Sequence, residues 1–245
     1  MPFTFSHPAI IFPLKCSFGR YLSLTGLITG SLAPDFEKFL KMEAESFYSH
    51  SWGGVFWFNL PMGILLALLF HAVIRNPLIE NLPEHLRKRL YRFKVVVFGE
   101  IFKKNYGKVL ISIFIGAISH IIWDNITHSP DTLIRISRFI GLTHETTDLI
   151  LNYFRYFDDT SSLLGILSIY LIILFLDKDK IASANYVSKL KFWSILFLSA
   201  ASILFTRVWL GYTKIEFFEL VFAGIASCLW GLLFSCIIFR RNNFI

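Results

Sequence analysis

The residues best suited to chemistry lie between Gly116 and Pro130, at the end of an apolar segment. His120, Asp124 and His128 stand four residues apart there, and residues at this spacing share one face of a helix. Neutral imidazole and carboxylate are the ligands of Zn²⁺, and of Mn²⁺ or Fe²⁺ where carboxylates dominate. A bound divalent ion lowers the pKa of its water and makes a nucleophile near neutral pH. The pattern therefore favours a hydrolytic metal centre.

Helix geometry limits how these three side chains can act together. A straight helix rises ~12 Å between His120 and His128, too far for one ion with bonds of about 2 Å. Three arrangements remain open. The helix ends near Asn125 and His128 folds back, two ions bind, or one residue only supports the ligands. Pro130 disfavours a helical conformation at the residue before it, which favours the early end.

Each of these residues also has an ordinary structural interpretation. His120 can bond to a neighbouring helix, Asp124 can bond to backbone groups of a loop, and His128 can lie in a turn. The position of these three residues, at the end of a membrane-length apolar run, favours a functional site. Ionisable residues in a membrane are costly unless they are paired, and they usually have a function.

The composition predicts an all-α, polytopic integral membrane protein. Of the 245 residues, 55% are hydrophobic and 17% charged, against about 25% charged in a soluble domain. The apolar residues form continuous runs, and a bilayer is crossed by roughly 20 such residues. We expect about five transmembrane helices, preceded by an N-terminal hairpin of two short helices within residues 6–34. The expected spans are 55–74, 109–123, 162–176, 192–210 and 217–239.

We expect one membrane domain over 1–245, in three consecutive parts. Residues 1–54 form the hairpin and an outer loop, 55–130 form the spans with the His/Asp cluster, and 131–245 form an outer loop and three further spans. Pro130 starts a helix in that outer loop, with Leu133, Ile136 and Ile140 on one face. Pro61 is expected to kink the span that contains it.

The N-terminal segment allows two interpretations. The hairpin uses the small residues of its second helix for close packing and brings His7 and Asp35 to the same side. A single tilted span from about Ala9 to Ala33 would separate these two residues and would bury Lys15 and Arg20.

Charge predicts the orientation in the membrane. The formal charge is +7, and basic residues gather in 75–108 and at the C-terminus, so both are expected in the cytoplasm. This basic stretch suits anionic lipid headgroups better than nucleic acid; we expect membrane lipids and no nucleic acid as partners. The three cysteines show no metal-ligand spacing.

This topology gathers further polar residues on the outer side. Asp35 and His50 join His120, Asp124 and His128 there, and His7 joins them in the hairpin arrangement. Asp35 and Asp124 are the candidates for a general base. His71 lies near the basic loop, outside the cluster.

Two charged residues lie near the outer ends of consecutive spans. Arg207 and Glu219 are expected to form an ion pair, because an unpaired charge there is costly. The alternative is that Arg207 binds an anionic group of a substrate.

Several short motifs follow one another in the first half of the chain. They are Met-Pro-Phe-Thr-Phe-Ser-His-Pro-Ala at 1–9, Gly-Ser-Leu-Ala-Pro-Asp-Phe-Glu at 30–37, His-Ser at 50–51, Asn-Leu-Pro-Met-Gly at 59–63, Arg-Asn-Pro-Leu at 75–78 and Ser-His-Ile-Ile-Trp-Asp-Asn-Ile-Thr-His at 119–128. Together they resemble a bacterial membrane family known as domain of unknown function 4184. The resemblance is clearest over the first 130 residues, and the remainder matches as general membrane spans.

That family is similar, more loosely, to inner-membrane proteins classed as metal-dependent hydrolases. The resemblance implies a site made of His7, Asp35, His50, His120 and Asp124, with His128 as an addition, and it supports the hairpin. It implies a divalent metal, expected to be zinc, and hydrolysis of a lipid or envelope ester or phosphoester. The alternative is a non-enzymatic protein, scaffold or transporter-like, whose cluster holds helices together; a transporter would need polar residues continuing inward, where only His71 stands.

Overall fold

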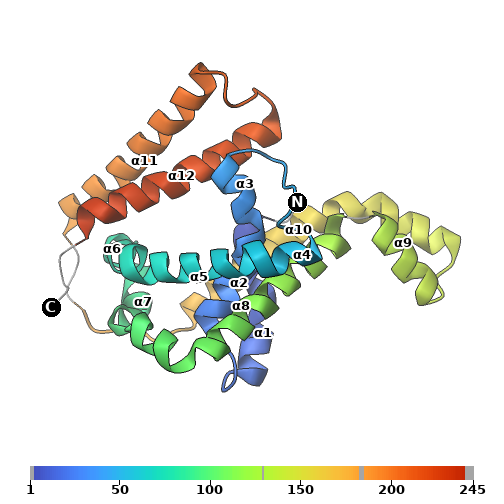
Figure 1. Ribbon diagram of the computed structural model, residues 1–245, viewed down its shortest axis with the longest axis horizontal. Helices are drawn as coiled ribbons and strands as arrows, with labels where there is room; N and C mark the ends of the chain where they lie inside the picture. Colours follow the sequence, from blue (N-terminus) through green and yellow to red (C-terminus); the bar gives the residue numbers. More distant parts are fainter. Residues whose placement is uncertain (1–2, 129, 182–184, 241–245) are drawn as a thin grey trace. The chain divides into compact units, whose positions relative to one another are not determined.

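The computed structural model describes residues 3–128, 130–181 and 185–240, without the side chains of His128, Phe154, Arg155, Phe157 and Asp158. Helices make up most of these residues, short turns and irregular segments join them, and no strand occurs among them (Figure 1). The all-α prediction is confirmed. The chain divides into two compact units, each built from segments distant in the sequence.

The first unit contains the residues up to Pro34, Tyr48–Ile64 and Tyr106–Ile172. Its helices either contribute residues to the predicted site, pack beside it, or come after it in the chain. They are the 3₁₀ turn η1 (Thr4–Ser6), α1 (Pro8–Phe18), α2 (Leu24–Leu32), α4 (Trp52–Gly54), the π-helical η3 (Val55–Asn59), most of α8 (Phe98–His128), α9 (Pro130–Phe139) and α10 (His144–Leu174).

The N-terminal segment forms a hairpin of two helices rather than one continuous helix. α1 and α2 are separated at Gly19–Ser23, and they bury Ile11 and Leu27 against each other. Lys15 lies in α1, and its Nζ donates to the backbone carbonyl of Gly19 at 2.9 Å and to that of Leu22 at 2.7 Å. The charged amino group of Lys15 is therefore satisfied by the carbonyls of the turn, whereas a single span would have had to bury it.

α2 and α8 pack at backbone distance. A Cβ added at Gly30 would lie 2.1 Å from the carbonyl oxygen of Ile113, and one added at Gly116 would lie 2.4 Å from that of Leu27. Only glycine at these positions lets the two helices approach so closely. The approach places the end of α2 beside the part of α8 that contains His120.

The first membrane-length helix is longer than predicted. Trp52–Asn81 is helical throughout, through α4, η3, α5 (Leu60–Leu69), the π-helical η4 (Phe70–Ile74) and α6 (Arg75–Asn81). Pro61 follows the π-helical turn η3 directly, and such turns commonly mark a bend or a functional position. Arg75 was expected in the basic loop. It lies within this helix, is buried, and donates to the carbonyls of Lys94 and Val96.

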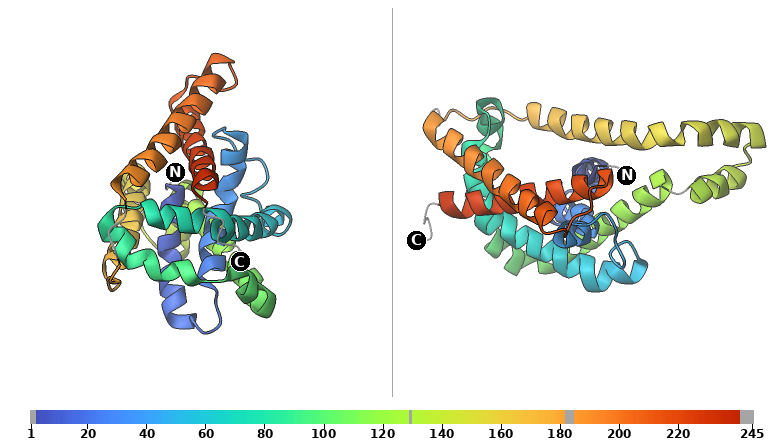
Figure 2. Two further views of the ribbon diagram at one scale, coloured as in Figure 1. Left: turned by 90° about the vertical axis from the view of Figure 1, so that its left-hand side faces the viewer. Right: turned by 90° about the horizontal axis from the view of Figure 1, so that it is seen from above.

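The second unit contains Asp35–Phe47, Leu65–Asn105 and the chain from Ile173 onward. Its main feature is the pair α11 (Tyr186–Trp209) and α12 (Phe217–Phe239), which lie side by side (Figure 2). Ser235 of α12 donates to the carbonyl of Phe192 at 2.8 Å. The unit also contains α3 (Phe36–Lys41), α7 (Glu84–Leu90) and the 3₁₀ turn η5 (Tyr91–Val95), together with η4, α6, the end of α5 and the start of α8.

Several basic side chains of residues 75–108 have acidic partners inside the second unit. Arg87 lies 3.5 Å from Glu80, Arg92 lies 2.8 Å from Asp179, and Lys94 also pairs with Glu80. These residues hold α6, α7 and η5 together. Contact of the stretch with lipid headgroups stays a prediction.

Four helices are long and apolar enough to cross a membrane: Trp52–Asn81, Phe98–Thr127, Tyr186–Trp209 and Phe217–Phe239. They correspond to four of the five predicted spans. The first two extend beyond the predicted spans at both ends, the third begins earlier than predicted, and the fourth has the predicted bounds. The fifth prediction, 162–176, falls in α10, whose apolar part Asp159–Leu174 is shorter than the others. It continues a helix that begins at His144 in polar sequence. In the sequence, the change from polar to apolar residues suggested a loop followed by a span. In the structure no residue ends the helix at this point, so both parts belong to α10.

Candidate metal centre

The predicted site residues of the first unit meet around the carboxylate of Asp124. Its Oδ1 lies 3.4 Å from Nε2 of His7, and its Oδ2 lies 3.3 Å from Nε2 of His50 and 3.3 Å from Nε2 of His120. The four residues come from three places in the chain: the turn before α1, the loop before α4, and α8 itself. The α1–α2 hairpin thus brings His7 to the end of α8.

These nitrogen–oxygen distances are informative. A charge-assisted hydrogen bond between an imidazolium and a carboxylate is about 2.7–2.9 Å long. Two ligands of one tetrahedral zinc ion, each about 2.0–2.1 Å from the metal, are about 3.4 Å apart. The separations of 3.3–3.4 Å match the second case better than the first.

The hydrogen bond on the far side of His120 fixes how that ring can act. Its Nδ1 lies 2.7 Å from the backbone carbonyl of Ser31, and a carbonyl only accepts, so Nδ1 carries the proton. In a neutral ring this leaves Nε2, the atom facing Asp124, with a lone pair. A lone pair that faces a carboxylate needs a proton or a cation between them. Metal-bound histidines typically make this outer bond to a carbonyl.

The imidazole rings also lie close to one another. The centroids of His7 and His120 are 3.7 Å apart with an interplanar angle of 20°, and His50 meets His120 edge-on at 5.4 Å. Stacked rings at this distance would repel each other if both were protonated. Neutral imidazole is the form that binds metals.

Asp35 completes the group. It is the last residue of the 3₁₀ turn η2 (Ala33–Asp35), which continues α2 directly, so the chain itself holds it next to Pro34 of the first unit. Asp35, His50, His120 and Asp124 each offer one ligand atom, and these atoms all lie within 4.8 Å of one another. Lys38 donates to Oδ1 of Asp35 at 2.8 Å, with both side chains buried. Sequence analysis missed Lys38, although its i+3 spacing from Asp35 in a short helix is a recognisable pattern.

Most of the site is buried, and one edge of it is partly exposed. His7, Asp35 and His120 are buried, whereas the side chain of His50 is 23% exposed and that of Asp124 is 14% exposed. A molecule from outside would reach the centre along the edge formed by these two residues.

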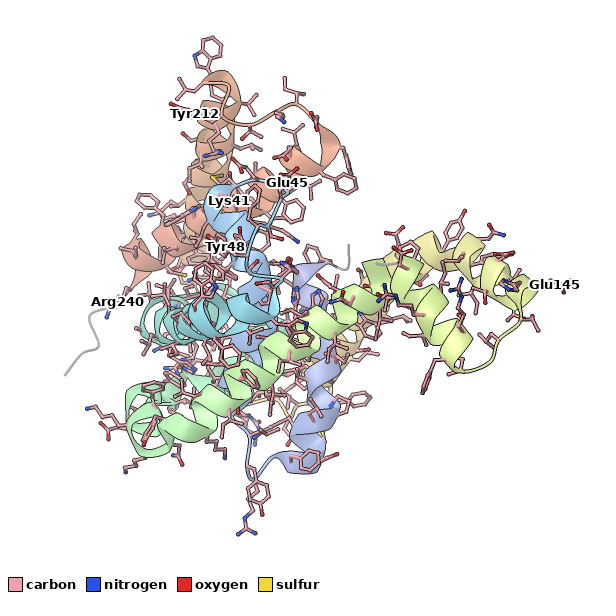
Figure 3. All side chains as sticks on the ribbon, turned by 45° about the vertical axis from the view of Figure 1, so that its right-hand side comes forward. Lys41, Glu45, Tyr48, Glu145, Tyr212 and Arg240 are labelled. Carbon is pink, nitrogen blue, oxygen red and sulfur yellow. The ribbon has the colours of Figure 1, made fainter. Side chains whose placement is uncertain are left out.

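A further set of contacts positions His50. The hydroxyl of Ser49 lies 3.0 Å from its Nδ1, and the amide of buried Asn59 donates to the Ser49 carbonyl at 2.8 Å. Gly54 lets this loop approach the helix, because a Cβ there would lie 2.0 Å from the Tyr48 carbonyl oxygen; Tyr48 is labelled in Figure 3. Sequence analysis missed Ser49 and Asn59. An asparagine inside an apolar run was the available indication.

Other predicted residues are placed differently. α8 continues to His128, so the predicted helix end near Asn125 is wrong, and the side chain of His128 lies outside the described part of the chain. His71 is in the second unit, where it stacks on Phe98 at 4.4 Å and bonds to Arg75. The two remaining histidines, His85 and His144, are exposed.

The predicted ion pair between Arg207 and Glu219 does not form among the described side chains. Arg207 donates to the hydroxyl of Thr213 and to the carbonyls of Lys41 and Tyr212, at 3.2–3.4 Å. Glu219 accepts instead from the backbone N–H of Ala44. Both charges are met by the polar groups of loops at the helix ends, so they need no mutual pairing.

Together, the fold and the site define a helical protein with membrane-length helices and a His/Asp group that could hold a metal ion. A family model described as "Domain of unknown function (DUF4184)" matches residues 1–237, and the chain belongs to this family. The match extends well past the first 130 residues, where the resemblance was expected to be clearest. No curated protein and no solved structure matches the chain.

Proposed function

We propose that this protein is a membrane-embedded, metal-dependent hydrolase. The observation that supports the proposal most strongly is the convergence of three imidazoles on Asp124 at 3.3–3.4 Å, with the His120 ring oriented as in a metal ligand. Its four membrane-length helices suit one multi-pass domain in a bacterial inner membrane, with 75–108 and the C-terminus in the cytoplasm.

The donor set suits a divalent ion, and we propose zinc. His7, His50 and His120 with Asp35 and Asp124 would hold it, and His128 is a further candidate. Bound there, the ion would lower the pKa of a water molecule and so supply a nucleophile. Either Asp35 or Asp124 would take a proton from the attacking group as general base.

The substrate class follows from where the open edge lies. His50 and Asp124 are the exposed members of the group, and both lie near the outer ends of membrane-length helices under the proposed orientation. An ester or phosphoester of a lipid or envelope component would be presented at that level. Arg207 remains a candidate for binding an anionic group of the substrate.

The second candidate function is structural. Two contacts favour it, because neither needs a metal: the bond from His120 to the Ser31 carbonyl joins α8 to α2, and the Asp35–Lys38 ion pair is already satisfied. In that case the cluster would stabilise the helices and have no chemistry. His120→Ala would then unfold the protein, whereas a catalytic role leaves it folded and inactive.

Hydrolysis can be tested directly on purified protein in detergent with added zinc. Wild type would be assayed on a panel of phospholipids and phosphoesters beside Asp124→Asn and the exposed Lys103→Gln. We expect zinc-dependent turnover in wild type and Lys103→Gln, and loss of it in Asp124→Asn. Zinc-loaded wild type without turnover on any substrate of the panel would count against the hydrolase and favour the structural alternative.

A further inference from the structure

α9, the helix that follows the site, exposes large apolar side chains. Phe139 is 91% exposed, Ile140 beside it 60%, and Ile136 41%. Ile136 and Ile140 lie on the face predicted from the sequence. In a soluble segment three such neighbours would be unusual, because exposed apolar patches generally mark an interaction surface.

The rest of α9 is arranged like a helix at a membrane surface. Asp131, Arg135 and Arg138 form an exposed charged edge next to the apolar one, while Ser137 is buried and faces the protein. A helix with an apolar edge, flanking arginines and one packed edge is typical of segments that lie in the plane of the lipid headgroups.

Connectivity gives an independent reason for this placement. The membrane-length part of α8 ends at Thr127, and α9 begins at Pro130. A helix of 30 residues is about 45 Å long, which matches the acyl core together with both headgroup layers, so its end lies in the headgroup region when it spans. A helix that starts three residues later must begin at the same depth.

The first half of α10 has the same character. α9 and α10 are joined by a short turn at Gly141, whose φ is +74°. α10 begins at His144, and Glu145 lies in its first turn (Figure 3). Leu149, Tyr153 and Tyr156 follow at helical spacing and are each 57–62% exposed. Tyrosines are enriched at membrane–water interfaces, where the ring lies among lipids and the hydroxyl reaches water.

We propose that Pro130–Tyr156, which we call the interfacial hairpin, lies in the headgroup–acyl boundary of a lipid bilayer. Phe139 and Ile140 insert among the acyl chains, and Arg135 and Arg138 bind lipid phosphates. The proposal rests on the membrane part of the proposed function and not on hydrolysis. It has a consequence for the site, because Asp124 lies only four residues before the end of α8, about 6 Å along the helix. The His/Asp cluster would then lie at about the depth of the ester and phosphate groups of the lipids.

Spin labels at matched positions of one helix test the proposal. The three free cysteines would be replaced by serine, and single cysteines introduced by Phe139→Cys or Arg135→Cys would be labelled in full-length protein. The protein would be reconstituted in phosphatidylethanolamine–phosphatidylglycerol vesicles. We expect the label at 139 to collide more with oxygen than with a water-soluble nickel complex, and the label at 135 to show the reverse.

A label introduced by Phe234→Cys, at an exposed position of α12, separates the two proposals. If 234 is oxygen-accessible but 139 is reached mainly by nickel, the interfacial hairpin is overturned and membrane insertion stands. If 139 is shielded from both reagents, protein covers it, such as a second copy, and the proposal is also overturned. If 234 is reached by nickel, the membrane assignment itself fails.

The arginines provide a second test, in which lipid charge is varied and the label at 139 is kept. We expect Arg135→Gln combined with Arg138→Gln to reduce oxygen accessibility at 139 in vesicles containing phosphatidylglycerol, and to have no effect in phosphatidylcholine alone. An equal effect in both lipids would overturn the assignment of these side chains to lipids with a net negative charge.

Discussion

The contact between α2 and α8 gives the sharpest prediction about how the site is built. In Gly30→Ala, the new Cβ would lie 2.1 Å from the carbonyl oxygen of Ile113 and 2.8 Å from its carbonyl carbon. Ordinary carbon–oxygen contacts are about 3.3 Å or longer. Backbone atoms cannot move aside as a flexible side chain can, so the two helices must separate by about 1.2 Å.

The separation has a cost that can be worked out from the same contact. The hydrogen bond from His120 to the Ser31 carbonyl, now 2.7 Å, would stretch to roughly 3.9 Å and be lost. Overpacking costs about 1–3 kcal/mol, and the lost hydrogen bond about 1 kcal/mol. We therefore expect a loss of about 2–4 kcal/mol in the free energy of unfolding. Since His120 also loses its orienting bond, metal affinity should fall by about 10–100-fold.

The matched control lies in α8 itself. A Cβ at Gly107 meets nothing within 4 Å, so Gly107→Ala should be neutral or gain up to about 1 kcal/mol from helix propensity. Denaturant unfolding and zinc titration of both variants in detergent provide the comparison. Equal stability and equal zinc affinity in Gly30→Ala and Gly107→Ala would refute the close-packing explanation.

Three further outcomes follow from the site. Asn59→Ala should weaken zinc binding about 10-fold through misplacement of His50 without loss of secondary structure; competition with a chelator measures it, and unchanged affinity would contradict the positioning role. Lys38→Met leaves the buried Asp35 carboxylate without its cation, so the free energy of unfolding of the metal-free protein should fall by about 3–5 kcal/mol. Zinc should restore part of this loss. If zinc does not change the stability of the variant, Asp35 is not a ligand. Zinc at about 100 times its dissociation constant should stabilise wild type by about 2.7 kcal/mol, and a chelator should reverse the gain in a thermal melt.

The sequence predicted the helical class, and it singled out Asp35, His50, His120 and Asp124, whose ligand atoms lie close together in the structure. Apolar runs of membrane length gave the four long helices, because no strand or loop can satisfy its backbone in lipid. The i, i+4 spacing put His120 and Asp124 on one face. The hairpin interpretation used the small residues of α2 for close packing, and Gly26 and Gly30 of this helix do make the close contact with α8.

Other features depended on tertiary contacts that spacing does not encode. Arg75 looked like a loop residue by its charge, yet the carbonyls of Lys94 and Val96 let it sit inside a helix. The pairing of Arg207 with Glu219 was inferred from charge, whereas each found polar backbone groups nearby. Ser49 and Lys38 act on His50 and Asp35 through local bonds between common residue types, and such bonds have no distinctive pattern in one sequence.

The most direct test of the account is the metal content of the purified protein. Wild type in detergent would be analysed for zinc, manganese and iron beside His120→Ala and Asp124→Ala, with size-exclusion profiles to confirm that each variant remains folded. The account predicts about one or two metal ions for each wild-type chain and loss of the metal in both variants while they stay monodisperse. Metal-free wild type after zinc supplementation, or variants that retain the full metal content, would contradict it.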